Sequence, residues 1–278
     1  MIYNEIKLGI MQGRLLPKFK SRYQAHPLGY WQSEFKLASQ RGLDCIEFIL
    51  DYNDYEQNPL LSSKGINQIK HEINKNGVTV ESICADYFME APFHSKNIDK
   101  VKKSIDVLNH LIYNSSSLGI KNIIIPCVDN SSIKIRDFDL ICKQLEEPLK
   151  IAEKKLINLC LETDLPPLDF QNLLNKFSSN HVKVNYDIGN SASLGYDMNE
   201  EFASYGESIV DVHIKDRSFG GGSVELGKGA ANFDLLLKNL LEINYRGIIV
   251  MQAYRDDDGK KIFDKQFAYF KKKFKKIL

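Results

Sequence analysis

Eight short apolar runs recur along this chain, and longer segments with helical spacing separate them. Each run is mostly apolar at successive positions, as expected for parallel strands that are buried on both faces. The runs occupy residues 6–11, 43–49, 78–84, 121–127, 157–162, 182–188, 209–214 and 247–252. This regular alternation of strand and helix favours an α/β fold built on a parallel sheet.

The segments between the runs carry apolar residues every three or four positions, which predicts helices with one buried face. In residues 138–156 the stripe begins at Phe138 and ends at Leu156, and Pro148 is the expected site of a kink. The last helix repeats the stripe in Phe263, Phe267, Phe270, Phe274 and Ile277. Its lysines fall mainly on the other faces, which favours a solvated helix over one that lies on a membrane.

Eight strand and helix units within 278 residues, without a linker or low-complexity stretch, predict one domain over residues 1–278. The expected architecture is a single (β/α)8 TIM barrel. A doubly wound open sheet is the alternative. That fold usually carries a GxGxxG turn after its first strand, and GIMQGRL at residues 9–15 does not match the pattern.

The charges of the chain are almost balanced, with 37 Lys and Arg against 36 Asp and Glu and a net charge of +1. This balance gives no broad attraction toward nucleic acid or an anionic membrane, so neither is an expected partner. The opening apolar stretch is too short for a signal peptide, and no run approaches the roughly 18 apolar residues of a membrane span. We therefore expect a cytoplasmic protein.

Four runs in the second half of the chain end in a polar side chain that can bind a metal. They are Glu162, Asp187, His213 and Gln252, at intervals of 25, 26 and 39 residues. One unit of an eight-unit barrel averages about 31 residues, so this spacing places all four at the carboxyl ends of successive strands. Two carboxylates, an imidazole and an amide suit one divalent cation, such as Mn²⁺, Mg²⁺, Co²⁺ or Zn²⁺.

The same strand ends carry a family resemblance. The segments CLETD, NYDIGN, VHIKDRS followed by ELGKGAANF, and YRGIIVMQAY resemble the xylose isomerase-like barrels. This superfamily contains sugar phosphate isomerases and epimerases as well as the AP endonucleases, and the block that starts at VHIKD is most similar to the epimerase and isomerase branch. The resemblance implies one divalent metal held by Glu162, Asp187 and His213, with Gln252 in the fourth position. It also implies a small carbohydrate substrate, with or without a phosphate group.

Gln252 departs from the commonest pattern of the family, in which two glutamates serve as acid and base. Its amide oxygen can bind a hard cation, but the amide cannot accept and return a proton. Epimerisation usually needs two proton-transfer groups, whereas aldose-ketose isomerisation needs one base, and Glu162 can supply it. We expect a metal-dependent sugar or sugar-phosphate isomerase or epimerase that works through a metal-stabilised enediolate.

Lys215 follows His213 by two residues and would point the same way, because strand side chains alternate. It is the second candidate catalytic residue beside Glu162, since it can hydrogen-bond a substrate oxygen or protonate an intermediate. An ion pair with Asp187 or Glu162 is the alternative.

Further polar residues near the strand ends can complete a substrate pocket. Glu47 and Asp86 end the second and third strands, where either could replace the missing base, bind a hydroxyl or form an ion pair. His94, just after the third strand, is a candidate hydroxyl ligand. Arg217 and Arg255 are the cations expected at a substrate phosphate, and salt bridges with neighbouring aspartates are the alternative.

Three other functions share this scaffold. An AP endonuclease needs several extra histidines, but the chain has only six, and Asn190 stands where a nuclease would be expected to have a histidine ligand. A non-catalytic barrel that only binds a sugar or a metal is compatible with Gln252. A metal-dependent polyol-ketone dehydratase, the third alternative, is built on the same barrel. Barrels of this kind often form homo-oligomers, and the sequence leaves the oligomeric state open.

Overall fold

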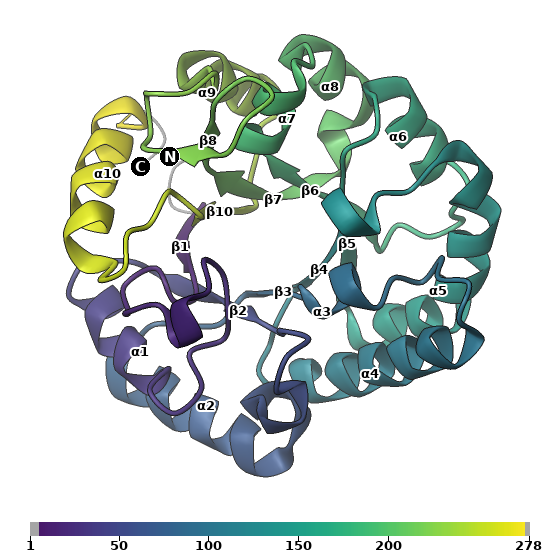
Figure 1. Ribbon diagram of the computed structural model, residues 1–278, viewed down its shortest axis with the longest axis horizontal. Helices are drawn as coiled ribbons and strands as arrows, with labels where there is room; N and C mark the ends of the chain where they lie inside the picture. Colours follow the sequence, from purple (N-terminus) through teal and green to yellow (C-terminus); the bar gives the residue numbers. More distant parts are fainter. Residues whose placement is uncertain (1–5, 276–278) are drawn as a thin grey trace.

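The structure is a computed structural model that describes residues 6–275, within which eight parallel strands close into a barrel (Figure 1). Around the barrel β1 lies between β2 and β10, and the other strands follow in chain order. The barrel strands are β1 (Lys7–Met11), β2 (Cys45–Ile49), β3 (Ser82–Cys84), β4 (Asn122–Cys127), β5 (Asn158–Thr163), β6 (Val182–Asp187), β7 (Ile209–Ile214) and β10 (Ile248–Met251). The predicted (β/α)8 TIM barrel is confirmed, and its extent as one domain over residues 1–278 stays a prediction.

Most helices form a ring around the barrel, and the short α3 lies inside this ring beside β4 (Figure 1). The helices are α1 (Gln32–Ser39), α2 (Ser63–Asn76), α3 (Tyr87–Glu90), α4 (Ile98–Ser116), α5 (Phe138–Lys155), α6 (Pro167–Leu174), α7 (Ile188–Leu194), α8 (Met198–Tyr205), α9 (Phe233–Glu242) and α10 (Lys260–Lys273). Short 3₁₀ helices lie in the connections at Phe19–Ser21 (η1), Tyr55–Gln57 (η2), Pro59–Leu61 (η3), Asp129–Ser131 (η4), Ile135–Asp137 (η5) and Gly206–Ser208 (η6). The small antiparallel strands β8 (Asp216–Arg217) and β9 (Ser223–Val224) follow β7 and form a separate hairpin.

The predicted and observed strands differ most at the run 78–84. Here only Ser82–Cys84 forms β3, and Thr79 makes an isolated parallel bridge to Cys45. Between them lies Glu81, whose buried carboxylate pairs with Lys7 and Lys121 and whose backbone oxygen accepts from the N–H groups of Lys121 and Asn122. The ends of the other seven runs agree with the observed strands to within two residues.

The alternation of strand side chains decides which residues enter the barrel. On β2, Ile46 and Phe48 pack with the helices in the outer core, whereas Cys45 and Ile49 belong to a smaller cluster supplied by six of the barrel strands. Glu47 lies between these last two on the same face of the strand. A carboxylate is therefore placed inside the barrel, directly below its carboxyl end.

The last helix buries the face that its sequence predicts. Phe263, Phe267, Phe270 and Phe274 are all buried, and Ile277 lies outside the described residues. The rings of Phe270 and Phe274 stack with centroids 4.4 Å apart. Between residues 6 and 275, no helix combines the length and the apolar character that crossing a bilayer requires.

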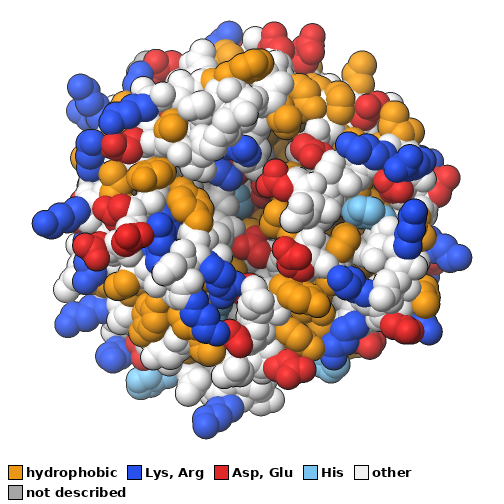
Figure 2. All heavy atoms as spheres, in the orientation of Figure 1, with side chains coloured by type: hydrophobic (Ala, Val, Ile, Leu, Met, Phe, Trp, Pro, Cys, Tyr) orange, Lys and Arg blue, Asp and Glu red, His pale blue; other side chains and the backbone are white. Residues whose placement is uncertain are grey.

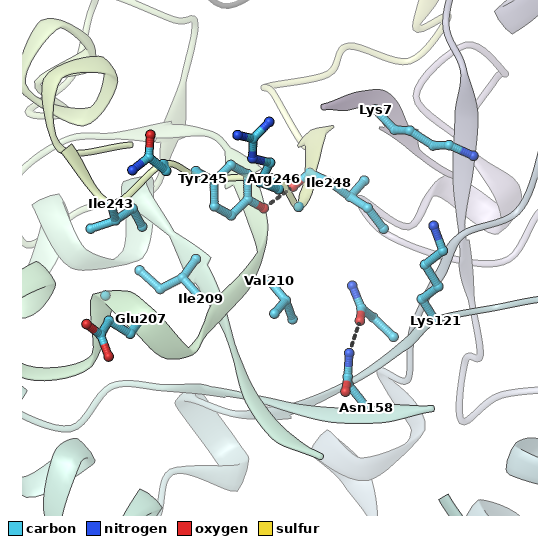
Figure 3. A pocket seen from close by; sticks show the side chains of 14 residues that line it. Lys7, Lys121, Asn158, Glu207, Ile209, Val210, Ile243, Tyr245, Arg246 and Ile248 are labelled. Carbon is cyan, nitrogen blue, oxygen red and sulfur yellow. Dashed lines mark hydrogen bonds between the residues drawn. The ribbon is translucent and has the colours of Figure 1, made fainter. Parts of the chain in front are cut away.

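A cavity of about 380 Å³ lies at the amino ends of the strands (Figure 3). Lys7, Ile209 and Ile248, which begin three of the barrel strands, lie on its wall. Its lysines Lys7 and Lys121 are both paired with Glu81. Because barrel enzymes carry their chemistry at the opposite, carboxyl end, this cavity is not the expected active site.

Candidate metal and active site

Three of the four predicted ligands come together at the carboxyl ends of adjacent strands. Glu162 lies in β5, Asp187 ends β6 and His213 lies in β7. One ligand atom from each of them lies within 4.8 Å of the other two, and all three side chains are buried. Neighbouring parallel strands end at the same edge, so the barrel itself creates this cluster.

The buried carboxylate of Glu47 contacts the His213 imidazole from the interior of the barrel. Its Nε2 lies 2.8 Å from Oε1 of Glu47, while Nδ1 lies 3.6 Å from Oε2 of Glu162 and 3.1 Å from Nδ2 of Asn185. Burial by itself lowers the pKa of His213, but the charge of Glu47 and its hydrogen bond reverse this and raise the pKa to about 10. A carboxylate on one ring nitrogen orients the other toward a metal, as is common for histidine ligands.

The Glu162 carboxylate accepts one amide hydrogen bond on each oxygen. Asn185 donates to Oε2 over 2.7 Å, and Asn190 donates to Oε1 over 2.8 Å. Burial, followed by the charge of Asp187, raises the pKa of Glu162 to about 7. The position of the carboxylate is therefore fixed, and its proton affinity lies in the range that suits a general base.

Asp187 joins the strand end to the next helix and also pairs with Lys215. Its Oδ1 accepts from the backbone N–H of Asn190 at the start of α7, and its Oδ2 lies 3.2 Å from Nζ of Lys215. Lys215 also donates to Oδ1 of Asn190 over 3.1 Å. The ion pair that the sequence allowed is thus present, and Lys215 still faces the pocket.

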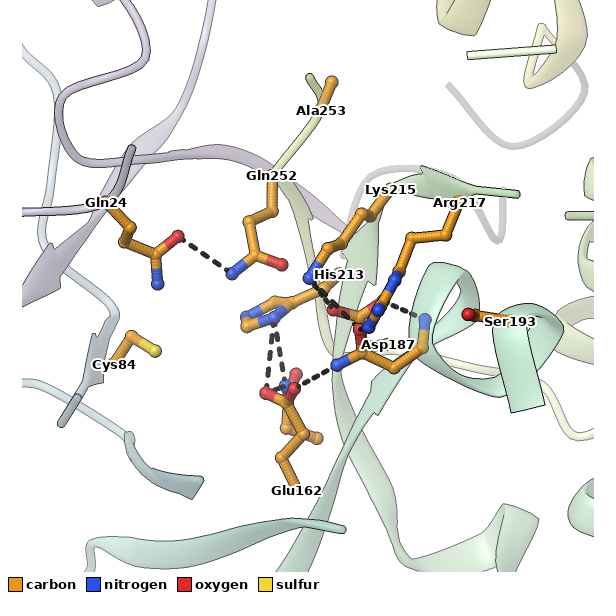
Figure 4. Close-up of polar contacts among 12 residues, drawn as sticks. Gln24, Cys84, Glu162, Asp187, Ser193, His213, Lys215, Arg217, Gln252 and Ala253 are labelled. Carbon is orange, nitrogen blue, oxygen red and sulfur yellow. Dashed lines mark hydrogen bonds and ion pairs between the residues drawn. The ribbon is translucent and has the colours of Figure 1, made fainter. Parts of the chain in front are cut away.

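Gln252 follows β10 directly and contributes a carbonyl oxygen with no hydrogen-bond donor. Its Nε2 donates to Oε1 of Gln24 over 3.2 Å, whereas its own Oε1 is buried and without a partner among residues 6–275. In Figure 4 this oxygen points to the side on which His213 and Lys215 lie. A buried carbonyl without a donor is expected where a cation binds. Together with the cluster of carboxylates and imidazole it fits a divalent metal.

Glu162, Lys215 and Gln252 border a pocket of about 480 Å³ at the carboxyl ends of the strands, whereas the buried Asp187 and His213 do not line it. Five predicted residues line it: Asp86, Glu162, Lys215, Arg217 and Gln252. Figure 2, in the orientation of Figure 1, shows a central hollow with acidic side chains at its edge and basic ones nearby. The pocket is therefore polar and of a size that suits a small ligand.

Three predicted substrate-binding residues lie away from this pocket. Glu47 is fully buried, where it accepts from Ser82 and contacts His213, and it does not line the pocket. His94 borders a small separate cavity between α3 and α5. Arg255 is buried and donates to the backbone oxygens of Gly13 and Leu16. The structure gives no support to substrate contact by these three.

Arg217 lines the pocket and donates to two neutral oxygens, so the salt bridge with a neighbouring aspartate, the alternative for this residue, is not seen within residues 6–275. Its Nη1 donates to Oδ1 of Asn190 over 2.9 Å, and its Nε donates to the backbone oxygen of Gly221 over 2.9 Å. Its neighbour Asp216 turns away and accepts from backbone N–H groups of the following loop. Arg217 is therefore placed to meet a ligand at the edge of the pocket.

Sequence reasoning missed three amides that organise the site: Gln24, Asn185 and Asn190. Asn185 could have been found, because it lies two residues before Asp187 and shares its face of the strand. Asn190 stands one turn into the helix that Asp187 caps. Gln24 lies in the long connection between β1 and α1, where no sequence pattern indicates which way a side chain points.

Fold and site together define a (β/α)8 barrel with a polar, metal-compatible cluster at the carboxyl ends of its strands. The family described as the xylose isomerase-like TIM barrel matches residues 35–273, and the chain belongs to this family.

Two curated relatives match most of the chain. The Haemophilus influenzae protein named "Putative L-ribulose-5-phosphate 3-epimerase SgbU" is 24% identical over 259 residues, 84% of this chain and 87% of the relative. The Mycoplasma pneumoniae protein named "Probable L-ribulose-5-phosphate 3-epimerase UlaE" is 24% identical over 222 residues, 75% of this chain and 71% of its own.

Solved structures share the fold at lower identity. The IolI protein with a bound zinc atom has a TM-score of 0.78 and 15% identity, over 98% of this chain and 99% of its own. The 3-keto-D-glucoside 4-epimerase YcjR from E. coli has a TM-score of 0.75 and 16% identity, over 96% of this chain and 99% of its own.

Proposed function

We propose that this protein is a metal-dependent epimerase or isomerase of a small sugar or sugar phosphate. The observation that carries the proposal is the meeting of Glu162, Asp187 and His213 within 4.8 Å, next to a polar pocket that Glu162 lines. The names of the relatives support the same class, because both curated ones are named as 3-epimerases of a ketose phosphate. We also propose a cytoplasmic location and leave the oligomeric state open.

The residues that would hold the metal are Glu162, Asp187 and His213, with the carbonyl oxygen of Gln252 beside them. Their oxygens and imidazole nitrogen suit Mn²⁺, Mg²⁺, Co²⁺ or Zn²⁺. When bound, such an ion supplies Lewis-acid stabilisation of the negative charge that develops on a substrate oxygen. Glu47 keeps the His213 ring in place for this task through its 2.8 Å contact.

Glu162 is the proposed base. It takes the proton from the carbon next to the substrate carbonyl. The electron pair of that C–H bond forms a carbon–carbon double bond, and the π pair of the carbonyl moves to its oxygen to give an enediolate. Asn185 and Asn190 hold both carboxylate oxygens, so the base needs little reorganisation before it reacts. Its pKa of about 7, raised by burial and by Asp187, suits proton transfer near neutral pH.

The step that returns the proton separates the two reactions. If Glu162 returns it to the neighbouring carbon on the same face, the product is an isomer in which the carbonyl has moved. If a second group protonates the original carbon from the opposite face, that centre is inverted. Lys215 is the second group we propose, because the amide of Gln252 does not transfer a proton and Lys215 faces the same pocket. Arg217 and Asp86 are proposed to bind substrate oxygens, with Arg217 at a phosphate where one is present.

Hydrogen exchange tests the proposal directly. The metal-loaded protein is incubated in D₂O with a panel of ketoses and ketose 5-phosphates, and NMR measures deuterium at the carbon next to the carbonyl. We expect exchange with at least one member, and Glu162→Gln should slow it by at least about 100-fold because the base is gone.

The matched control is Glu201→Gln. Glu201 is also a buried carboxyl, but it lies on α8 and bonds to Tyr186, Ser191 and Tyr205. This variant should retain exchange. If the wild-type protein shows no exchange with any sugar on the panel, the barrel binds its ligand without proton transfer and the proposal is wrong.

A further inference from the structure

The amide of Gln252 has a defined direction. A glutamine side chain presents donors at one end and an acceptor at the other, in nearly equal shapes, so its neighbours decide which way it faces. The Gln252 Nε2 donates to Oε1 of Gln24, and its own Oε1 is left free of donors within residues 6–275. Figure 4 shows the nitrogen turned to Gln24 and the oxygen turned away from it.

The orientation of the Gln24 amide is in turn fixed by two groups, one that can only donate a hydrogen bond and one that accepts. Arg14 Nη2 donates to Oε1 of Gln24 over 2.9 Å, and a guanidinium can only donate. At the other end Gln24 Nε2 donates to Oδ2 of Asp86 over 2.8 Å, where a carboxylate oxygen accepts. A reversed Gln24 would place N–H groups against Arg14 and an oxygen against Asp86, so both contacts would become repulsive.

Arg14 and Asp86 are themselves anchored. Arg14 is buried, and its Nε donates to the backbone oxygen of Ala253, the residue that follows Gln252. Asp86 accepts from Sγ of Cys84 at its other oxygen, over 3.2 Å. The chain of contacts from Asp86 through Gln24 to Gln252 therefore has one direction, and that direction presents the oxygen of Gln252 to the ligand cluster.

We propose that Arg14, Gln24 and Asp86 are positioning residues that hold the carbonyl oxygen of Gln252 toward the metal. The inference rests on the proposed function, because it takes Gln252 as the fourth metal ligand. A carboxylate in this place would offer an oxygen in either direction, whereas an amide offers one oxygen only. The pair of Gln24 and Asp86 thus compensates for an amide ligand.

The test measures metal affinity and needs no substrate. The full-length protein is freed of metal and titrated with Mn²⁺, and the EPR signal of the unbound ion gives the Kd. Gln24→Leu should weaken Mn²⁺ binding by about tenfold, the lower end of the losses seen when groups that orient metal ligands are removed. Gln171→Leu is the control, because it also removes an amide hydrogen bond, to the Ser204 carbonyl on α8, and should leave the Kd unchanged.

A double-mutant cycle distinguishes the loss of the Gln252 amide orientation from a general disturbance of the fold by Gln24→Leu. In the Gln252→Glu background both terminal atoms are oxygens, and one of them faces the fixed oxygen of Gln24. Gln24→Leu should therefore leave Mn²⁺ affinity unchanged or improve it there, although it weakens binding when Gln252 is present. An equal loss in both backgrounds would mean that Gln24 only supports the fold, and the inference would be wrong.

The outcomes also separate this inference from the proposed function. If the wild-type protein binds no Mn²⁺, the metal site of the proposed function and this inference are both wrong. If it binds Mn²⁺ and Gln24→Leu binds equally well, only the positioning role is wrong.

Discussion

The Nε2 atom of His213 lies 2.8 Å from Oε1 of Glu47, and both side chains are fully buried below the mouth of the barrel. Glu47 reaches this position because it shares the inner face of β2, while His213 comes from β7 on the other side of β1 and β10. The contact crosses the barrel interior. It connects the metal-compatible cluster to a carboxylate that no substrate can reach.

Glu47→Gln should weaken Mn²⁺ binding by about ten- to 100-fold, because an amide orients and polarises the His213 ring less strongly than a carboxylate. The measurement is again the Mn²⁺ titration of metal-free protein. Glu201→Gln is the control, since Glu201 is another buried carboxyl but lies on α8 and bonds to Tyr186, Ser191 and Tyr205. Equal Kd values for the wild-type and Glu47→Gln proteins would contradict a supporting role for Glu47.

Asp216 organises the loop that follows the small hairpin of β8 and β9. Its carboxylate accepts from the backbone N–H groups of Gly227, Gly229 and Ala231, at 2.8, 2.9 and 3.1 Å. Asp216→Asn keeps the shape but loses the charge and turns an N–H group toward these donors. We expect a loss of about 2–3 kcal/mol in the free energy of unfolding.

Urea unfolding measures this loss, and Lys228→Ala in the same loop is the control. Lys228 is exposed and pairs with Glu225 at the surface, so its removal should change the free energy of unfolding by no more than about 0.5 kcal/mol. Equal stability of Asp216→Asn and the wild-type protein would show that the loop does not depend on these bonds.

The residues that sequence reasoning placed correctly lie on regular strands. Glu162, Asp187 and His213 end runs whose apolar pattern marks both the strand and its end, and the parallel barrel then brings such ends together. At each of these residues the apolar pattern predicts where the strand ends, and the closed parallel barrel places that end at its mouth. For this reason the meeting of these three side chains could be predicted from one sequence, while their role as metal ligands stays a prediction.

The residues that sequence reasoning misplaced or missed lie in connections. His94 and Arg255 follow strand ends in the sequence, but their directions depend on how the loops pack, and both turn away from the pocket. Gln24 enters the site from a connection of some twenty residues, with no periodicity to reveal it. The hairpin of β8 and β9 is equally hidden, because two residues per strand leave no pattern.

Replacement of Phe270 tests how the last helix packs against the barrel. Its ring is 1% exposed and stacks on Phe274, so Phe270→Ala should open a cavity and cost about 3–5 kcal/mol in the free energy of unfolding. Phe219→Ala is the control, because Phe219 is 76% exposed. Urea unfolding of both variants should show a large loss only for Phe270→Ala, and similar losses would contradict the burial of this face.

His26 should make the stability of the protein sensitive to acid. Its ring is buried beside Trp31 and Phe48, Nδ1 lies 2.9 Å from Oε1 of Gln12, and burial lowers the pKa of His26 to about 3. The unfolded chain binds the proton near pH 6.5, so the stability from neutral His26 is complete above that pH and is lost as the pH falls toward 3.

Replacing His26 by phenylalanine removes this titration while keeping an aromatic ring in the site. We expect the stability of wild type relative to His26→Phe to fall by about 2 kcal/mol between pH 7 and pH 5, at roughly 1.4 kcal/mol for each pH unit below 6.5. Urea unfolding at the two pH values measures the difference, and carboxyl groups common to both proteins cancel. His110→Phe, at an exposed position on α4, should show a much smaller change. If the difference between wild type and His26→Phe is the same at both pH values, the imidazole is not held neutral in the folded protein.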